Sequence, residues 1–369
     1  MTRTPGRHGY HAFMPRSLPR ELALEARTQL VLSSADIAVG RLAGAGRLLP
    51  NPAILIAPFV NREALESSRI EGTQASLSEV YASAAAEGPE SVDITEIRNY
   101  LRALQHGRDR LAGGLPLSLR LIREMHAILL EGVRGEERTP GDFRTSQNWI
   151  GPPGATLATA SFVPPPADAM HDSLADWERF PHADVAMPIL VQCGLLHYQF
   201  ETIHPFLDGN GRLGRLFVIL FLAERDVLPE PLLYVSAFFE RHRHEYYSRL
   251  QGVRERGEMQ EWLHFFFTGV AEQATDALAR AERLVDLREH YRATLAGQTR
   301  SRAPEVVDLI FENPVLTGPY VARRLGVTGQ SGINLCRQLE VAGIVRQAQR
   351  APGGRLRWIA EEVLDAIEG

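Results

Sequence analysis

The sequence predicts a mainly α-helical protein with one short β-hairpin and a small second domain towards its C-terminal end. Apolar residues recur every three to four positions over most of the 369-residue chain, which is the period of an amphipathic or buried helix. Clusters of breakers fall between these periodic runs, at 152–154, at 164–166, and at Pro229 and Pro231. A hydrophobic content of 44% is sufficient for one large core and a smaller additional one.

The predicted helices follow one another with short breaks. In chain order the periodic runs cover residues 21–45, 94–111, 118–130, 167–180, 186–202, a run beginning at 213, 246–256, 259–268 and 270–295. Residues 156–166 differ, because they are extended and bounded by prolines, and they suit a short hairpin arm. Phe162 and Val163 within this arm either dock another chain by strand addition or tuck into the core. The sequence leaves both interpretations open.

Composition narrows the classes of function. The formal net charge is −5, so the global electrostatics favour neither nucleic acid nor a membrane as the main partner. Cys193 and Cys336 lie far apart in sequence, which argues against a disulfide framework or a cysteine zinc site. The N-terminal residues contain no apolar run typical of a signal peptide, and the apolar run 216–222 is too short to span a bilayer. We therefore expect a cytoplasmic protein.

The chain contains no lysine, so every fixed positive charge is an arginine. The usual phosphate-binding P-loop requires a lysine and cannot be present. A phosphate must therefore be held by arginine, backbone amides, helix ends or a metal ion.

The most informative run is HYQFETIHPFLDGNGRLGR, residues 197–215, which lies between two apolar helices. It must form a loop that ends by starting a helix, with residues 209–211 at the turn. Glycines let backbone amides point inward, and the first turn of the helix adds its own amides and dipole, so this turn is a candidate anion site. Arg212 and Arg215 share one face of that helix. Two positive charges at a helix N-terminus are unfavourable unless an anion lies between them, and a polyphosphate would supply it.

Two further side chains of this loop indicate chemistry. Asp208 beside a phosphate would repel the ligand unless Mg²⁺ bridges the carboxylate and the phosphate oxygens. His204 precedes the turn, and a neutral imidazole there can accept a proton from an attacking hydroxyl. We therefore expect nucleotidyl or phosphoryl transfer to a hydroxyl group.

Each of these residues has an ordinary structural interpretation when taken alone, and only their joint occurrence in one loop favours a site. A zinc site is the competing interpretation, built from His197, Glu201 and His204 with His242 and His244 as further imidazoles. The spacing is not that of a His-Glu-x-x-His site, which argues against zinc. We expect His197 and Glu201, one turn apart on a buried helix, to make a structural contact.

Residues 204–215, HPFLDGNGRLGR, resemble the Fic family motif HPFx(D/E)GNGRxxR at every defined position. PGDFRTSQNWIG at 140–151, SFVPPP at 161–166 and YYSRL at 246–250 resemble other parts of the family's core. REALESSRIEGT, at 62–73, resembles its N-terminal extension. The resemblance extends from about residue 10 to about residue 296.

The resemblance implies a Fic helical-bundle core with a short β-hairpin flap, and transfer of AMP from ATP to a Ser, Thr or Tyr hydroxyl of a protein, self-modification included. His204 would be the general base and Asp208 would hold Mg²⁺. Arg254 stands where some members have asparagine, so the adenine-side contacts differ. The implied nucleotide-binding residues are Asp208, Gly209, Asn210, Gly211, Arg212, Leu213, Gly214, Arg215 and Tyr246. The implied flap residues, which would position the target, are Thr159, Ala160, Ser161 and Phe162.

A second motif predicts an internal brake. Residues 67–72, SSRIEG, resemble the family's inhibitory pattern (S/T)xxxE(G/N). Asn61 is a plausible N-cap and Gly72 a plausible stop, so Glu71 would lie in the last turn of a helix at about 61–72, with Ser67 one turn earlier. The resemblance implies that Glu71 pairs with Arg215 and occupies the ligand of the γ-phosphate. A surface glutamate at a frayed helix end is the structural alternative.

Residues 304–313, 319–325 and 329–342 read as three helices, and two short strands follow around Pro352-Gly353-Gly354, which is a winged-helix pattern. Its basic and acidic residues nearly balance, so a DNA-binding regulator and a docking or dimer-forming module both remain open. We expect three domains: 1–90, 91–300 and 301–369. Removal of AMP from a target instead of its addition, and association with further copies of the chain, also remain open from the resemblance.

Overall fold

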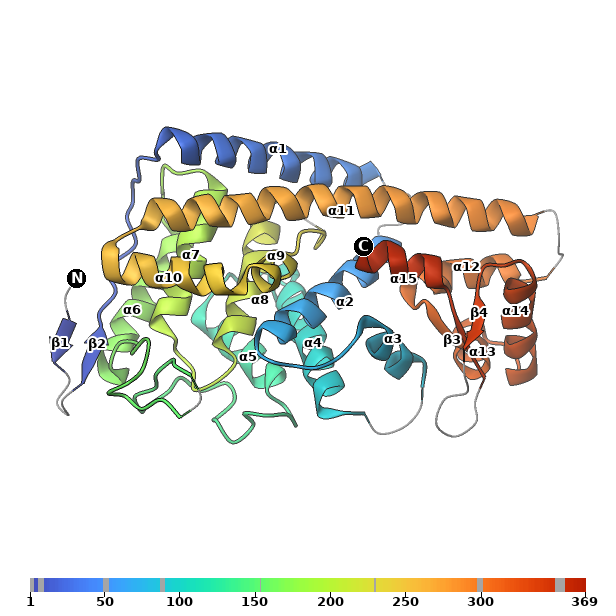
Figure 1. Ribbon diagram of the computed structural model, residues 1–369, viewed down its shortest axis with the longest axis horizontal. Coiled ribbons are helices and arrows are strands. Elements are labelled where there is room, and N and C mark those ends of the chain that lie inside the picture. Colours follow the sequence, from blue (N-terminus) through green and yellow to red (C-terminus); the bar gives the residue numbers. More distant parts are fainter. Residues whose placement is uncertain are drawn as a thin grey trace.

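The computed structural model describes residues 3–5, 10–48, 53–86, 90–152, 154–228, 230–296, 301–348 and 356–369. Helices dominate it, as predicted, and Figure 1 shows an elongated molecule with the C-terminal elements gathered at one end. The helices of the larger part are α1 (Ala26–Leu48), α2 (Ala53–Ile70), α3 (Leu77–Ala85), α4 (Val92–Ala112), α5 (Leu119–Leu129), α6 (Ala167–Arg179), η1 (Phe180–His182), α7 (Ile189–Ile203), α8 (Asn210–Glu224), α9 (Ser236–Arg241), α10 (Arg243–Arg256) and α11 (Met259–Ala296). None of the described helices has both the length and the apolar run needed to cross a membrane.

Helices α1 and α11 lie side by side along one edge of the molecule (Figure 1). The two runs predicted at 259–268 and 270–295 are in fact one helix, because Gly269 does not break it. A Cβ at position 269 would clash with the ring of Phe238, so the glycine permits a close approach between α11 and α9. Helix α1 begins at Ala26, five residues later than predicted.

The core of the larger part is built around α7 and α8, which pack against each other. Almost every side chain of α7 is buried, so its apolar residues are not confined to one stripe. Helix α7 ends at Ile203 and α8 begins at Asn210, and the six residues between them carry the predicted phosphate motif. The fold thus holds this loop between two rigid, buried elements.

Helix α2 is longer than predicted. It begins at Ala53, and Asn61 is not its N-cap: the Asn61 side chain donates to the Ala57 carbonyl at 2.8 Å inside the helix. The stop was predicted correctly, since Gly72 has a φ of +100° that glycine adopts without strain. Glu71 lies just beyond the last helical residue, Ile70, rather than in the last turn.

The C-terminal part contains the three helices and two strands that the sequence predicted, in the predicted order, together with two elements that were not predicted, β3 and α15. Its elements are α12 (Ala303–Glu312), β3 (Val315–Thr317), α13 (Gly318–Leu325), α14 (Gly329–Val341), β4 (Arg346–Ala348), β5 (Arg357–Ile359) and α15 (Glu361–Glu368). The strands form an antiparallel sheet in the order β3-β5-β4. The predicted turn at Pro352-Gly353-Gly354 lies outside the described residues.

This C-terminal part rests directly on the N-terminal helices. Helix α12 packs along α2, and β3 lies beside α3 (Figure 1). Asn313 donates to the Tyr81 carbonyl at 3.0 Å, and Thr317 donates to the Ala85 carbonyl at 3.1 Å. Helix α2 therefore contacts both the C-terminal part and the loop motif between α7 and α8.

The predicted hairpin at 156–166 is reduced to one antiparallel bridge, in which Ile150 and Phe162 exchange backbone hydrogen bonds of 2.8 and 3.0 Å. Residues 157–159 form a turn rather than a strand. On the other side of this segment, the Phe13 amide donates to the Val163 carbonyl at 2.9 Å, from the short strand β2 (His11–Phe13), which pairs with β1 (Arg3–Pro5). Phe162 and Val163 are buried, so the structure favours the interpretation that they tuck into the core.

Candidate active site

His204 terminates α7 in a left-handed conformation, with φ 49° and ψ 62°. Non-glycine residues adopt this region uncommonly, and the surrounding contacts must hold it there. The His204 carbonyl accepts hydrogen bonds from Arg144 Nε at 3.0 Å and from Asn148 Nδ2 at 3.4 Å. Burial, and then the positive charges of Arg254 and Arg144, lower the pKa of His204 to about 3. The imidazole is therefore neutral at pH 7 and can accept a proton.

The loop after His204 is fixed by side chains that bond its backbone. Asn210 accepts from the Phe206 amide and donates to the Phe206 carbonyl, both at 2.9 Å. His126 Nε2 donates to the Asp208 carbonyl at 3.0 Å, while His126 Nδ1 accepts from the Gly141 amide at 2.8 Å. The His126 ring also stacks on Phe206 at 3.7 Å between centroids. These contacts give the loop one defined shape before any ligand binds.

The start of α8 provides a site for an anion. Its N-cap, Gly209, has a φ of 73° and no side chain to cap the first backbone N–H groups of the helix. These groups and the helix dipole point towards the loop. Arg212 is nearly fully buried, and its Nε has no hydrogen-bond partner among the described residues. A buried guanidinium N–H without a partner is costly unless a ligand satisfies it.

Arg215 is the most deeply enclosed cation of the site, with 1% of its side chain exposed. Its Nη2 donates to Glu71 Oε1 and to the Ser67 carbonyl, at 2.9 and 2.8 Å, and its Nε donates to Ser67 Oγ at 2.8 Å. A Cβ on Gly211 would overlap Glu71 Oε1, so the carboxylate lies directly against the first turn of α8. Glu71 therefore fills the position of an anion in this site.

Glu71 and Arg215 each stabilise the charged form of the other. Burial acts to raise the pKa of Glu71, but Arg215, Arg212 and His204 outweigh it and hold this pKa below its usual value. Burial acts to lower the pKa of Arg215, and Glu71 is the largest of the groups that raise it above its usual value. The 35% exposure of the Glu71 side chain leaves its outer face open to water.

A cavity of about 510 Å³ opens beside these residues. Arg215, His204, Gly211, Glu71 and Glu201 line it. The other lining residues come from the segment before the flap, from the flap and from α10: Trp149, Ile150, Gly151, Ser161, Phe162, Tyr246, Tyr247, Leu250, Gln251 and Arg254. The structure thus brings the predicted base, the predicted brake, and Gly211 and Arg215 of the predicted anion site to one cavity, whereas Asp208, Gly209, Asn210 and Arg212 are not among its lining residues.

The predicted Tyr246 also lines this cavity, and its hydroxyl donates its proton to His197 Nε2 at 2.9 Å. His197 Nδ1 in turn donates to the Gly214 carbonyl at 3.1 Å. Because both ring nitrogens are used elsewhere, the structural contact expected between His197 and Glu201 is not a hydrogen bond between their side chains. Glu201 instead keeps a buried Oε1 without a partner among the described residues, and burial raises its pKa to about 7.

Two of the predicted nucleotide-binding residues, Leu213 and Gly214, lie on the buried side of α8. The side chain of Leu213 is fully buried in the core, and its amide closes the first helical hydrogen bond to the Gly209 carbonyl. Gly214 is not among the residues that line the cavity, and a Cβ there would lie 2.7 Å from Glu201 Oε1. Both residues pack α8 against α7, and neither presents a free group to a ligand.

The predicted flap residues divide in a similar way. Ser161 and Phe162 line the cavity of about 510 Å³, whereas Ala160 lines a neighbouring one. Thr159 closes the turn by accepting the Thr156 amide at 2.9 Å. Only the last two residues of the predicted flap are therefore positioned to meet a substrate in this cavity.

Sequence reasoning missed the residues that hold the loop. Arg144 is buried and donates to the carbonyls of Ile203, His204, Ser146 and Pro165. Asn148 donates to the Phe206 carbonyl at 2.9 Å. Both belong to the run at 140–151 that the sequence singled out, but nothing in the run indicates which backbone groups they bind. Arginine and asparagine in a proline- and glycine-rich loop were the available signal.

Among the described residues, no group of three or more His, Cys, Asp or Glu side chains could hold a metal ion. Asp208 alone fits the Mg²⁺ that the resemblance implies: its carboxylate is 45% exposed, and Arg212 approaches it at 3.5 Å. One oxygen accepts the Gly209 amide at 2.6 Å. Mg²⁺ is commonly held by one carboxylate together with substrate phosphates and waters, so a single acid is a suitable donor set.

Comparison with known proteins agrees with this geometry. Residues 30–109 match the family described as Fic/DOC family N-terminal, and residues 116–222 match the Fic/DOC family. The chain is 30% identical over 152 residues to "Protein adenylyltransferase Fic" of Aedes aegypti, which covers 40% of this chain and 27% of that protein. It is 27% identical over 184 residues to the protein of the same name from Drosophila willistoni, covering 49% and 33%. The chain thus spans about a third or less of the length of these relatives.

Solved structures show the same fold. A Fic family protein from Desulfovibrio desulfuricans G20 superposes with a TM-score of 0.60 at 19% identity, over 92% of this chain and 97% of that one. Fic-1 of C. elegans superposes with a TM-score of 0.51 at 20% identity, over 71% and 73%. The loop motif, the matched segments and the shared helical architecture lead to one conclusion: this chain belongs to the Fic family.

Proposed function

We propose that the chain is a protein adenylyltransferase, which transfers AMP from ATP to a hydroxyl of a protein and is restrained by its own Glu71. The observation that carries this proposal is the position of the Glu71 carboxylate. It lies on the first turn of α8, bonded to the buried Arg215, in the cavity that His204 lines. A carboxylate held by a guanidinium and a helix N-terminus occupies a site built for a phosphate. The relatives' name, protein adenylyltransferase, supports the same activity.

The chemistry follows from the neutral imidazole. The target hydroxyl gives its proton to a ring nitrogen of His204 as its oxygen forms a bond to the α-phosphorus of ATP. The bond from that phosphorus to the oxygen bridging to the β-phosphate breaks, and pyrophosphate leaves with the electron pair. The low pKa of His204 keeps the base unprotonated throughout the physiological range, although it also makes the base weak. Position rather than basicity must therefore supply most of its effect.

The phosphates would lie on the start of α8. The free Nε of Arg212 and the uncapped amides of the first turn supply donors to two phosphate groups, and Arg215 binds the third once Glu71 is displaced. Asn210 would act indirectly, since both ends of its side-chain amide bond the Phe206 backbone. Asp208 would hold Mg²⁺, which would neutralise charge on the phosphates. In this proposal Glu71 excludes the phosphate that Arg215 would bind, so ATP enters misaligned.

Labelled ATP tests the proposal directly. Wild type, Glu71→Gly and Glu71→Gly/His204→Ala are incubated with ATP, Mg²⁺ and cell lysate, and modified proteins are detected on a gel and by mass spectrometry. We expect weak labelling by wild type, strong labelling by Glu71→Gly and none by the double variant. Labelling that survives the loss of His204 would contradict its role as the base. Equal labelling by wild type and Glu71→Gly would contradict the inhibitory role of Glu71 but not the transfer activity.

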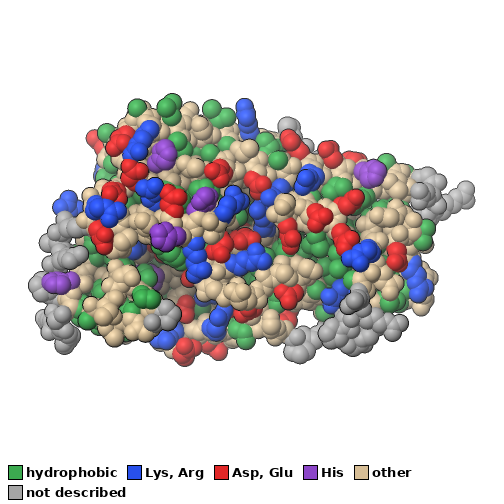
Figure 2. Space-filling model, in the orientation of Figure 1, with side chains coloured by type: hydrophobic (Ala, Val, Ile, Leu, Met, Phe, Trp, Pro, Cys, Tyr) green, Lys and Arg blue, Asp and Glu red, His purple; other side chains and the backbone are tan. Residues whose placement is uncertain are grey.

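A second function concerns the C-terminal part. Its helices and β3-β5-β4 sheet support a winged-helix domain, and its contacts with α2 and α3 favour a docking role over DNA binding. Figure 2 shows basic and acidic side chains interspersed over the face that it draws. That face does not carry the continuous basic patch that is typical of DNA-binding surfaces. The division into domains at 1–90, 91–300 and 301–369, self-association, DNA binding and the removal of AMP stay predictions.

A further inference from the structure

Arg254, on α10, is a buried cation that the proposed reaction does not yet use. Only 6% of this residue is exposed. Its Nε donates to Thr202 Oγ1 at 3.3 Å and its Nη2 donates to the Glu201 carbonyl at 3.1 Å. These acceptors belong to the last turn of α7, directly before His204. One edge of the guanidinium is therefore attached to the element that carries the base.

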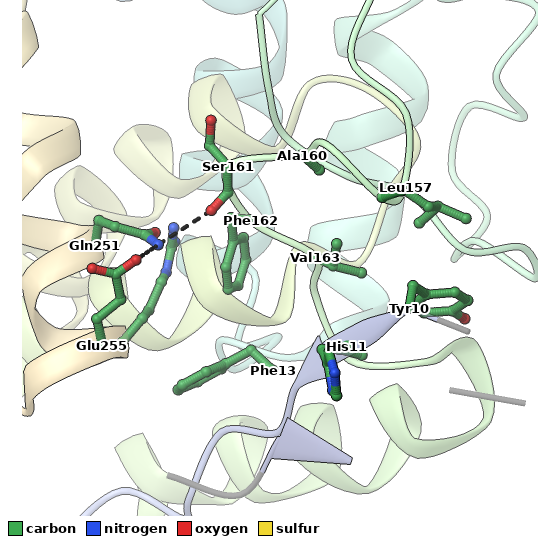
Figure 3. A pocket seen from close by; sticks show the side chains of 13 residues that line it. Tyr10, His11, Phe13, Leu157, Ala160, Ser161, Phe162, Val163, Gln251 and Glu255 are labelled. Atoms are coloured by element: carbon green, nitrogen blue, oxygen red, sulfur yellow. Dashed lines mark hydrogen bonds between the residues drawn. The ribbon is translucent and has the colours of Figure 1, made fainter. Parts of the chain in front are cut away.

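The face of the same guanidinium is attached to the flap. Its Cζ lies 3.8 Å from the centroid of the Phe162 ring, which is close stacking for a cation on an aromatic face. One turn earlier on α10, Gln251 Nε2 donates to the Ser161 carbonyl at 3.2 Å, and Figure 3 shows this bond together with the orientation of Phe162. Helix α10 thus holds two consecutive flap residues with two consecutive turns.

The residue type matters for this double contact. A guanidinium is planar, so it can stack through its face and donate through its edge at the same time, whereas a lysine ammonium cannot do both. Among the described residues, no carboxylate lies within salt-bridge distance of Arg254, and its hydrogen-bond acceptors are a neutral hydroxyl and a neutral carbonyl. A buried charge without a counter-ion is costly to the fold, so a stability role alone is a poor explanation for it.

We propose that Arg254 is a positioning residue that fixes Phe162 of the flap relative to the end of α7, so that an acceptor hydroxyl held by the flap reaches His204. This inference rests on the proposed adenylyltransferase function and specifies how the acceptor is placed. Arg254 lines both the cavity of about 510 Å³ and the neighbouring cavity of about 310 Å³. The flap residues Ser161 and Phe162 also line both cavities. The contact lies between the base and the acceptor, where a shift of about 1 Å can cost a factor of 10² in rate.

The charge of Arg254 acts in the same direction. Several charged groups face the imidazole of His204: Arg254 from α10, Arg144 from the loop after α5, and Glu71 from the end of α2. Burial and the two arginines favour the neutral ring, while Glu71 opposes them. Arg254 thereby keeps the base unprotonated while it holds the flap.

Hydrogen exchange tests the positioning without any need for activity. Arg254→Lys keeps the charge and loses the stack, Arg254→Met loses both, and Arg256→Met on the same helix is the matched control because the Arg256 side chain is exposed and paired with Glu258. We expect the amide of Phe162, which donates to Ile150, to exchange about tenfold faster in both Arg254 variants, while the amides of α7 stay protected. Unchanged exchange at Phe162, or an equal loss of protection in α7, would overturn the proposal. So would an Arg254→Lys variant that behaves like wild type.

The partition of AMP between two acceptors provides the functional readout. In the Glu71→Gly background, AMP carried to protein is compared with free AMP released when water attacks the α-phosphorus and pyrophosphate leaves. Water needs no flap, so we expect the ratio of protein transfer to hydrolysis to fall about tenfold in Arg254→Met and Arg254→Lys, while Arg256→Met keeps the ratio of the parent. A proportional loss of both reactions would refute the positioning role. If the Glu71→Gly parent consumed no ATP, the proposed function would fail, and the exchange experiment would still decide the role of Arg254.

Discussion

Replacing Glu71 with glutamine isolates the charge of the brake from its bulk. Glutamine has nearly the same size, and its Oε1 can still accept from Arg215, but it offers no negative charge. The contact at stake is one N–H···O bond of 2.9 Å between Arg215 Nη2 and Glu71 Oε1, while the two bonds from Arg215 to Ser67 are untouched. A hydrogen bond between charged groups contributes about 1.5–3 kcal/mol and an ordinary one about 0.5–1.5 kcal/mol, so the loss of the carboxylate charge weakens this contact by about 1–1.5 kcal/mol. Because 35% of the Glu71 side chain is exposed, solvent screening places the loss at the lower end, about 1 kcal/mol.

A nucleotide phosphate must displace this contact to reach Arg215, so the loss of about 1 kcal/mol translates into binding that is about fivefold tighter. Isothermal titration with a non-hydrolysable ATP analogue and Mg²⁺ measures it for wild type and for Glu71→Gln. Glu66→Gln is the control, since Glu66 pairs with Arg69 on the same helix and does not line the cavity that holds His204. Affinities within twofold for wild type and Glu71→Gln would show that the carboxylate does not compete with the nucleotide.

Two further predictions concern the walls of the site. Gly211→Ala places a methyl group where the Glu71 carboxylate now lies, so it should abolish ATP-analogue binding by titration even in the Glu71→Gly background; binding retained in that double variant would place the phosphates elsewhere. Glu201 has a folded-state pKa of about 7 against a usual value of 4.5, so its ionisation weakens the fold as pH rises from 4.5 through 7. Relative to wild type, Glu201→Gln should gain on the order of 2 kcal/mol in unfolding free energy between about pH 5 and about pH 8, measured by urea denaturation, and an equal difference at both pH values would contradict the assignment.

The sequence predicted the helical fold and the residues of the central loop because both depend on local signals. Periodicity identified α4, α5 and α7, and the run from His204 to Arg215 carries its chemistry within twelve consecutive positions. The start of α2 was missed because Asn61 was interpreted as an N-cap, whereas its side chain bonds the Ala57 carbonyl inside a helix that also contains Pro58.

The contacts of the loop could not be predicted for a different reason. Arg144 bonds backbone groups up to 60 residues away, and His126 bonds a carbonyl 82 residues away. No spacing rule relates such positions, since they meet only when α5, the flap and α7 have packed together. Leu213 and Gly214 were predicted to bind the nucleotide because they lie within the motif. Helical geometry instead places them on the buried face of α8.

The position of α2 relates Glu71, which we propose as a brake, to the C-terminal part of the chain. Arg62 of α2 bonds Asp276 of α11 at 3.0 Å, Asp276 also accepts from Arg280 at 2.7 Å, and Arg280 donates to the Ile367 carbonyl of α15 at 2.8 Å. This series of polar contacts connects the helix that ends at Glu71 with the last helix of the C-terminal part. Since α12 packs along α2 as well, α2 cannot move by itself to separate Glu71 from Arg215. Release of the brake must therefore either unwind the short segment after Ile70, where the helix has already ended, or shift the C-terminal part together with α2.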